Sequence, residues 1–83
     1  MKKAMSNKLL ELGYTKYRTD MYVKDVIVLQ YYGSSSQIYS KYVNLTVLAE
    51  SIEDIDRLES RLDFFREQVK IMNSDLEELK KYE

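Results

Sequence analysis

Residues 51–81 read SIEDIDRLESRLDFFREQVKIMNSDLEELKK, and this stretch decides the fold. Its apolar residues recur in steps of three and four, which is the spacing of an amphipathic helix with a heptad repeat. The first core position of the repeat holds Ile55, Leu62, Val69 and Leu76, and the second holds Leu58, Phe65, Met72 and Leu79. Ser51 is a suitable N-cap for this helix. The pattern therefore predicts one long helix over residues 51–82.

A second possible helix start lies within this stretch. Ser74 and Glu77 have the spacing of a capping box, and this pair allows a kink or a break near Asn73. The apolar repeat passes through Asn73 without changing phase. The repeat therefore favours a continuous helix over a broken one.

The residues before this helix show two different periods. Residues 4–13 have the apolar spacing of a short helix and end at Gly13, which suits a left-handed C-terminal cap. The following residues alternate with a period of two, and this predicts three strands, in residues 14–24, 26–32 and 38–48, with a loop at 33–36. We therefore expect a single α+β domain over residues 1–83, with an antiparallel three-stranded sheet between the two helices.

Alternation assigns the side chains of the first predicted strand to two faces. Tyr17, Met21 and Val23 share the face that we expect to pack on the core. Tyrosine is enriched in this half of the chain, since seven of the eight tyrosines lie in residues 1–49. Tyrosine often anchors protein interfaces, and beside cations it can also stack on nucleic-acid bases. The outer face is accordingly our candidate surface for a partner protein or nucleic acid: Lys16, Arg18, Tyr22 and Lys24.

Charge is distributed unevenly along the chain. Residues 1–49 contain seven Lys or Arg and three Asp or Glu, a net charge of +4, whereas residues 50–83 contain six and eleven, a net charge of −5. A charge of +4 spread over half of the chain is weak for a nucleic-acid-binding protein. The alternative for the tyrosines is that they are strand-forming residues with solvated hydroxyls.

The long helix predicts a homodimer. A rod of some 30 residues is roughly 45 Å long, more than the diameter of a compact chain of this size. We expect its first half to cover the sheet and its second half to pair with another copy, through Phe65, Val69, Met72, Leu76 and Leu79. A parallel pair places Arg61 opposite Arg66, which repels, and Asp75 opposite Lys80, which attracts. An antiparallel pair places Glu59 opposite Arg66 twice but brings Asp54 against Asp75, so the balance of charges favours the antiparallel arrangement somewhat and leaves the parallel one open.

The composition argues against an enzyme. There is no Cys, so disulfides and thiolate metal sites are excluded, and there is no His, so the commonest general base and metal ligand is absent. Asp63 and Glu67 lie one turn apart, but interleaved Arg and Lys indicate a solvated helix face more than a metal or acid–base site. Gly33 and the serines after it lack the glycine spacing and Lys of a phosphate-binding loop. We predict no catalytic residue, no cofactor and no metal.

The sequence predicts no membrane span and no secretion signal. No apolar run approaches the roughly 18 residues that a spanning helix needs, and Met1, Lys2 and Lys3 are not followed by an apolar signal core. We therefore expect a cytoplasmic protein. The absence of Cys agrees with this location.

The order of these features resembles a group of known proteins. A short helix ending in Leu12, Gly13 and Tyr14, then strands rich in Tyr and Lys, then an acidic helix, is similar to the small uncharacterised accessory proteins of phages and prophages in low-GC Gram-positive bacteria. The resemblance implies a non-enzymatic inhibitor or modulator of a host or phage protein. With the dimer, it predicts a small protein-interaction module, with nucleic-acid binding and a structural or assembly role as the alternatives.

Overall fold

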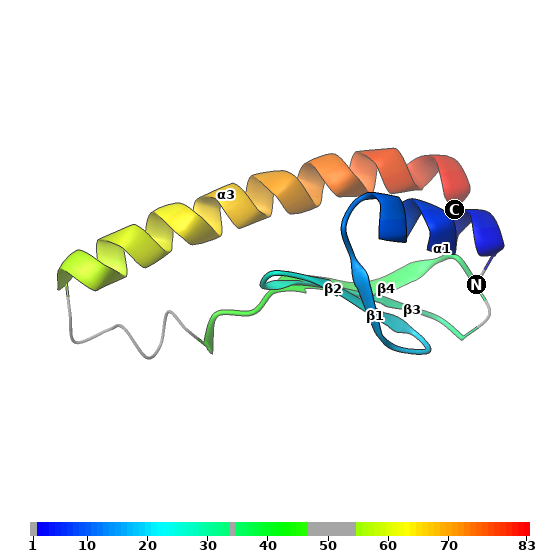
Figure 1. The fold of residues 1–83 in the computed structure, drawn as a ribbon, viewed down its shortest axis with the longest axis horizontal. Helices are drawn as coiled ribbons and strands as arrows, with labels where there is room; N and C mark the ends of the chain where they lie inside the picture. Colours follow the sequence, from blue (N-terminus) through cyan, green and yellow to red (C-terminus); the bar gives the residue numbers. More distant parts are fainter. Residues whose placement is uncertain (1, 34, 47–54) are drawn as a thin grey trace.

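The computed structural model describes residues 2–33, 35–46 and 55–83, and it has an α+β fold (Figure 1). The helices are α1 (Lys3–Glu11) and α3 (Ile55–Leu79), which is followed by a short 3-10 turn (Lys80–Tyr82). The strands are β1 (Thr15–Arg18), β2 (Met21–Lys24), β3 (Ile27–Tyr31) and β4 (Ile38–Val43). The predicted N-cap Ser51 and the predicted last residues of the third strand, 47–48, lie outside the described residues.

The described strands form a four-stranded antiparallel sheet in the order β1-β2-β3-β4. The antiparallel arrangement was predicted, but the number of strands was wrong. Residues 14–24 form a hairpin instead of one strand, with its turn at Thr19 and Asp20. Both residue types favour tight turns because their side chains hydrogen-bond nearby backbone. The next turn is at Asp25 and Val26, and Asp25 adopts the left-handed conformation there, with a φ of 53°.

The end of α1 is closed by the predicted glycine cap. Gly13 has a φ of 98°, a conformation that costs a residue with a Cβ atom about 1 kcal/mol or more. The Gly13 amide donates to the Leu10 carbonyl at 3.1 Å, and the Tyr14 amide donates to the Leu9 carbonyl at 3.0 Å. This pair of bonds is a Schellman motif. It reverses the chain so that β1 begins directly beneath the helix.

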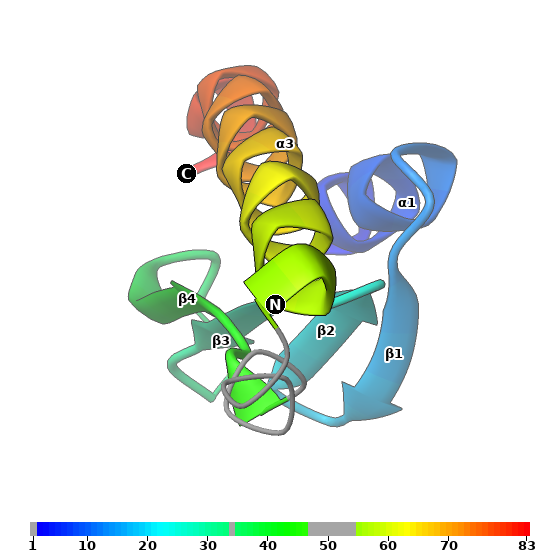
Figure 2. The same cartoon turned by 90° about the vertical axis from the view of Figure 1, so that its left-hand side faces the viewer.

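Both helices lie on one face of the sheet, and the core is formed between them and the strands (Figure 2). The side chains of the core cluster are nearly or fully buried: Met5, Leu9, Tyr14, Tyr22, Ile27, Leu29, Tyr31 and Leu79. Partly buried apolar side chains pack around them: Leu12, Ile38, Val43, Met72, Leu76 and Tyr82. The other face of the sheet, which we call the open face, is not covered by α1 or α3.

The long helix packs with the end opposite to the one we predicted. The side chains of α3 that belong to the core cluster or pack against it begin at Met72 and end at Leu79. Residues 56–71 extend away from α1 along the long axis of the molecule, whose extents are 44 × 21 × 18 Å (Figure 1). We call residues 72–79 the packed part of α3 and residues 56–71 the projecting part.

The reason for this orientation is the position of α1. It lies beside the packed part of α3, so the two helices together cover the sheet face that one helix alone would leave partly open. The sequence did not indicate which end of α3 would meet α1. The helix itself is continuous from Ile55 to Leu79, with no break at Asn73.

Candidate functional site

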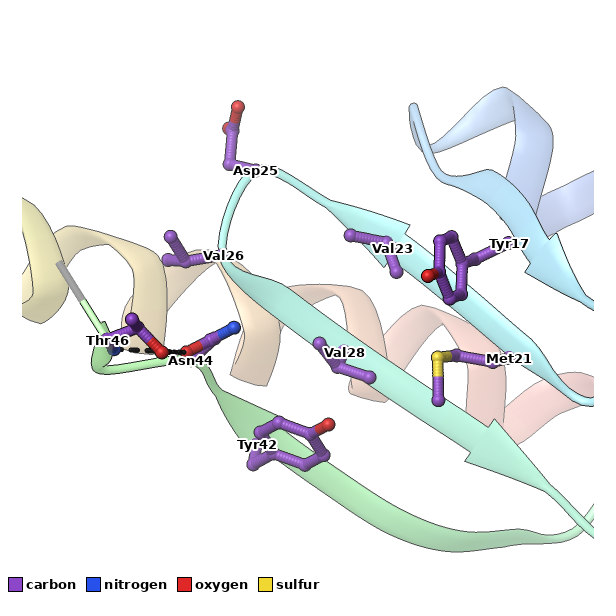
Figure 3. Close-up of a pocket in the computed structure, with 9 residues that line it drawn as sticks. All are labelled: Tyr17, Met21, Val23, Asp25, Val26, Val28, Tyr42, Asn44 and Thr46. Atoms are coloured by element: carbon purple, nitrogen blue, oxygen red, sulfur yellow. Dashed lines mark hydrogen bonds between the residues drawn. The ribbon is translucent and has the colours of Figure 1, made fainter.

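The open face of the sheet is the first candidate site, and the strand register builds it. In an antiparallel sheet, residues directly opposite each other point to the same side. Thr15 pairs with Val23, Val23 with Val28, and Val28 with Tyr42, so one row of side chains crosses all four strands. Figure 3 shows Val23, Val28 and Tyr42 on the side of the sheet away from α3.

A shallow depression of about 400 Å³ lies along this row (Figure 3). Its floor and walls are mainly apolar and aromatic side chains, with polar groups at the end near the β2–β3 turn. The lining residues are Tyr17, Met21, Val23, Asp25, Val26, Val28, Tyr42, Asn44 and Thr46. Tyr17 and Tyr42 are exposed, whereas Val28 is nearly buried between its neighbours. The depression therefore has an apolar floor with a tyrosine on either side.

Few charges border the open face. The Arg18 guanidinium lies 5.5 Å from the centre of the Tyr17 ring, a cation–π distance. Asp25 is at the other end of β2, in the β2–β3 turn. Lys16 is opposite Tyr22 and Lys41 is opposite Leu29, so the register assigns both lysines to the side of the sheet that the helices cover.

The residues that we predicted to form one binding face do not lie together on an exposed surface. Tyr22 is 2% exposed, and its hydroxyl lies 2.9 Å from the Ser6 hydroxyl of α1. Lys24 also points toward the helices. The prediction about which parity of residues 14–24 faces the core was therefore wrong. Of the predicted face, Lys16 and Arg18 remain exposed, at the edge strand β1.

A buried polar cluster explains why Lys24 faces inward. Its ammonium lies 2.6 Å from Asp75 Oδ2 and donates to the Leu12 carbonyl at 2.9 Å. The Tyr14 hydroxyl donates to the same carboxylate oxygen at 2.9 Å. Burial, and then the hydrogen bond to Asp75, raises the pKa of Tyr14 well above its ordinary value. These contacts join the α1–β1 connection, β2 and α3.

This cluster is better explained as a structural contact that stabilises the fold than as an active site. Asp75 and Tyr14 are buried, and the Lys24 side chain is only 19% exposed, so little of the cluster is open to a substrate. A buried charge that is paired and hydrogen-bonded avoids the cost of an unpaired one. The heptad pattern gave no sign of this role, because Asp75 lies outside the two apolar positions of the repeat.

The predicted dimer residues are divided between the two parts of α3. Leu79 is fully buried, and Met72 and Leu76 pack against the core of their own chain. Phe65 is buried as well, whereas Val69 is exposed. The prediction that the end of α3 lacks intramolecular cover was therefore wrong for Met72, Leu76 and Leu79.

The projecting part of α3 forms the second candidate site. A groove of about 500 Å³ runs between this helix and the segment after β4. It is lined by Leu45, Leu62, Phe65 and Val69, with Arg66 and Lys70 along one side. Phe64 and Ile71 are exposed apolar residues elsewhere on the projecting part. The sequence predicted uncovered apolar side chains from Val69 onward, whereas the exposed ones of the groove are Val69 and, in the half that was expected to cover the sheet, Leu62.

The acidic residues of α3 do not form a metal site among the described residues. Asp63 pairs with Arg66 at 3.2 Å, and Glu67 pairs with Lys70 at 3.2 Å. All four side chains are mostly exposed. They are solvated ion pairs of the kind that contributes little to stability.

Comparisons with protein-family models, curated proteins and solved structures find no match to this chain. Within the described residues, no helix has both the length and the apolar character needed to cross a membrane. The two surfaces described above are therefore the features from which a function can be inferred.

Proposed function

We propose that this protein is a small, non-enzymatic interaction module that binds a partner protein with the open face of its sheet. The observation that carries the proposal is the depression on the face that neither α1 nor α3 covers, where Val23 and the nearly buried Val28 lie between the exposed side chains of Tyr17 and Tyr42. Exposed apolar patches on small proteins often mark interaction sites. Tyr17 and Tyr42 add the residue type that is most common among interface anchors.

The chemistry of the open face defines the kind of partner. Its centre is apolar, so the partner should present an apolar patch that fits a shallow depression. Arg18 at one end and Asp25 at the other give the face a direction, because a partner must place an anion near the first and a donor near the second. Following the resemblance noted above, we propose that the partner is a phage or host protein of low-GC Gram-positive bacteria.

The open face gives little support to the alternative of nucleic-acid binding. Binding of a nucleic acid needs several cations along the phosphates. Lys16, Lys24 and Lys41 share the register of the helix-covered side, whereas the Arg18 guanidinium lies 5.5 Å from the centre of the Tyr17 ring. The apolar floor instead suits a protein surface.

Two tyrosines on β4 provide a matched test of the open face. Tyr42 is 43% exposed and lines the depression, whereas Tyr39 is 46% exposed and stacks on Tyr32 away from it. A photo-reactive amino acid at position 42 should cross-link to a partner in a Gram-positive host, and the same group at position 39 should not. Mass spectrometry then identifies the partner for binding assays with purified proteins.

The purified partner should bind Tyr39→Asp as it binds the unmodified chain. Tyr42→Asp should weaken binding by at least tenfold, because it places a charge against an apolar contact. Circular dichroism of both variants checks that the fold is unchanged. Equal binding by the two variants would show that the open face is not the recognition surface.

A further inference from the structure

We propose that the projecting part of α3 pairs with the same segment of a second copy of this chain, in antiparallel orientation. This pairing uses a different surface from the open face and goes beyond the function proposed above. The substitutions that test the pairing are in α3 and leave Tyr42 unchanged. One proposal can therefore fail while the other holds.

The first observation is the exposed apolar area on the projecting part. Leu62 and Val69 are seven residues apart, are 38% and 41% exposed, and line the groove together. Phe64 and Ile71 are a second exposed pair with the same separation, at 40% and 36% exposure, but they lie on a different face of the helix, because two residues correspond to a rotation of about 200°. A seven-residue repeat of apolar side chains is the pattern by which one helix packs against another. The occupant that fits this surface best is therefore a helix.

The second observation is the charge beside Leu62 and Val69. It indicates that the helix that packs on this surface belongs to a second copy of the chain. Glu59 and Arg66 have one heptad position in common, beside Leu62 and Val69, and both are exposed. When two such helices run antiparallel about a point near Leu62, Glu59 of each copy meets Arg66 of the other. Because the pair has two-fold symmetry, this attractive contact between Glu59 and Arg66 forms twice. A parallel pair would bring Arg61 near Arg66 and would repel.

The intramolecular contacts of these residues leave room for the pair. Arg66 pairs with Asp63 at 3.2 Å, but both side chains are about three-quarters exposed, so the guanidinium keeps free donors for a second carboxylate. Lys70 pairs with Glu67 on the same helix. The groove thus has an apolar floor with a basic side, and Glu59 of the second copy supplies the complementary charge.

The length of the contact sets its strength. The projecting part has about four turns, roughly 24 Å of helix, which is shorter than the span of most stable coiled coils. The dimer should therefore form in a concentration-dependent way. Sedimentation of the full chain over a wide concentration range measures its dissociation constant directly.

Charge reversal tests both the partner and the orientation. Glu59→Arg and Arg66→Glu should each raise the dissociation constant by about tenfold, because each creates two repelling contacts. An equimolar mixture of the two variants should associate at least as well as the unmodified chain, since both contacts between unlike copies are then attractive. Thermal unfolding of each dilute variant checks that the fold is intact.

Each possible result decides the proposal. Dimerisation that is lost in the single variants and recovered in the mixture supports it. A chain that stays monomeric at every concentration overturns it, and so does a dimer that the mixture fails to restore. Binding of the unmodified chain to vesicles of anionic lipid, with no dimer in solution, would instead assign the stripe to a membrane surface and would also overturn the proposal. Growth beyond a dimer would contradict the closed two-fold pair.

Discussion

The packed and projecting parts of α3 share one heptad pattern but have different surroundings. In the packed part, Leu79 is fully buried, and Asp75 is held by Lys24 and Tyr14 from two other elements. In the projecting part, Leu62 is 38% exposed and the nearby Asp63 pairs only along its own helix in the described residues. The difference teaches that a repeat indicates a helix with an apolar stripe, whereas neighbouring elements decide what covers each turn.

Truncation of one leucine in each part gives the largest expected contrast. Leu79→Ala should lower the free energy of unfolding by about 3 kcal/mol, because it leaves a cavity in the core. Leu62→Ala should cost under about 1 kcal/mol in the dilute chain, where this side chain stays partly solvated. Urea unfolding followed by circular dichroism measures both. Equal losses would remove the distinction between the two parts.

Neutralisation of one carboxylate in each part gives the next contrast. Asp75→Asn should cost about 2–3 kcal/mol, because it leaves the buried ammonium of Lys24 without its counter-charge. Asp63→Asn removes an exposed pair with Arg66 and should cost less than about 0.5 kcal/mol. The same unfolding experiment compares them. A negligible loss for Asp75→Asn would mean that the polar cluster does not stabilise the fold.

Alkaline pH should lower the free energy of unfolding, because two tyrosines of the core, Tyr14 and Tyr31, are buried. Burial raises the pKa of Tyr14 and of Tyr31, with added effects of Asp75 on the first and of Glu83 on the second. The unfolded chain therefore loses these protons first, near pH 10, and stability falls as the pH rises further. Each buried tyrosine contributes a slope of about 1.4 kcal/mol per pH unit.

Two tyrosine variants separate this effect from general alkaline denaturation. Tyr14→Phe should flatten the dependence of the urea midpoint on pH above 10, because it removes one of the two buried hydroxyl groups that ionise. Tyr17→Phe, at an exposed position on the open face, should leave the slope unchanged. Identical slopes in the two variants would show that Tyr14 ionises as freely as a surface tyrosine.

The smallest expected effect comes from a polar side chain in the projecting part. Gln68 is buried, and its Oε1 has no hydrogen-bond partner among the described residues. Gln68→Met keeps the length of the side chain and removes the unsatisfied carbonyl, so it should stabilise the chain by about 1 kcal/mol. Gln37→Met, in an exposed loop, should have no effect. Destabilisation by Gln68→Met would mean that the Gln68 side chain makes a hydrogen bond that stabilises the fold.

The elements could be predicted from the sequence where the local signal was strong. The heptad repeat gave the long helix, Gly13 gave the end of the first helix, and alternation gave an antiparallel sheet. The turn at Thr19 and Asp20 was missed, because alternation continues through a two-residue turn with little change. Local pattern was therefore sufficient for the type of each element but not for every boundary.

The sites could not be predicted to the same extent, because they depend on tertiary contacts. Alternation separated Tyr22 and Lys24 from Met21 and Val23 without indicating which face was buried. The charged face looked like the outer one, but Lys24 has a buried partner in Asp75, fifty-one positions away in sequence. Similarly, the position of α1 decides which end of α3 is covered. No local pattern contains that information.

Amide hydrogen exchange along α3 tests the division between its two parts most directly. In dilute solution, amides of residues 72–79 should exchange slowly and those of residues 56–71 faster, because the core cluster and the side chains packed against it include Met72, Leu76 and Leu79 but none of the described residues of the projecting part. At concentrations where the chain dimerises, the projecting part should gain protection while the packed part changes little. Slow exchange over the whole of α3 in dilute solution, or fast exchange of residues 56–71 in the concentrated protein, would contradict this account.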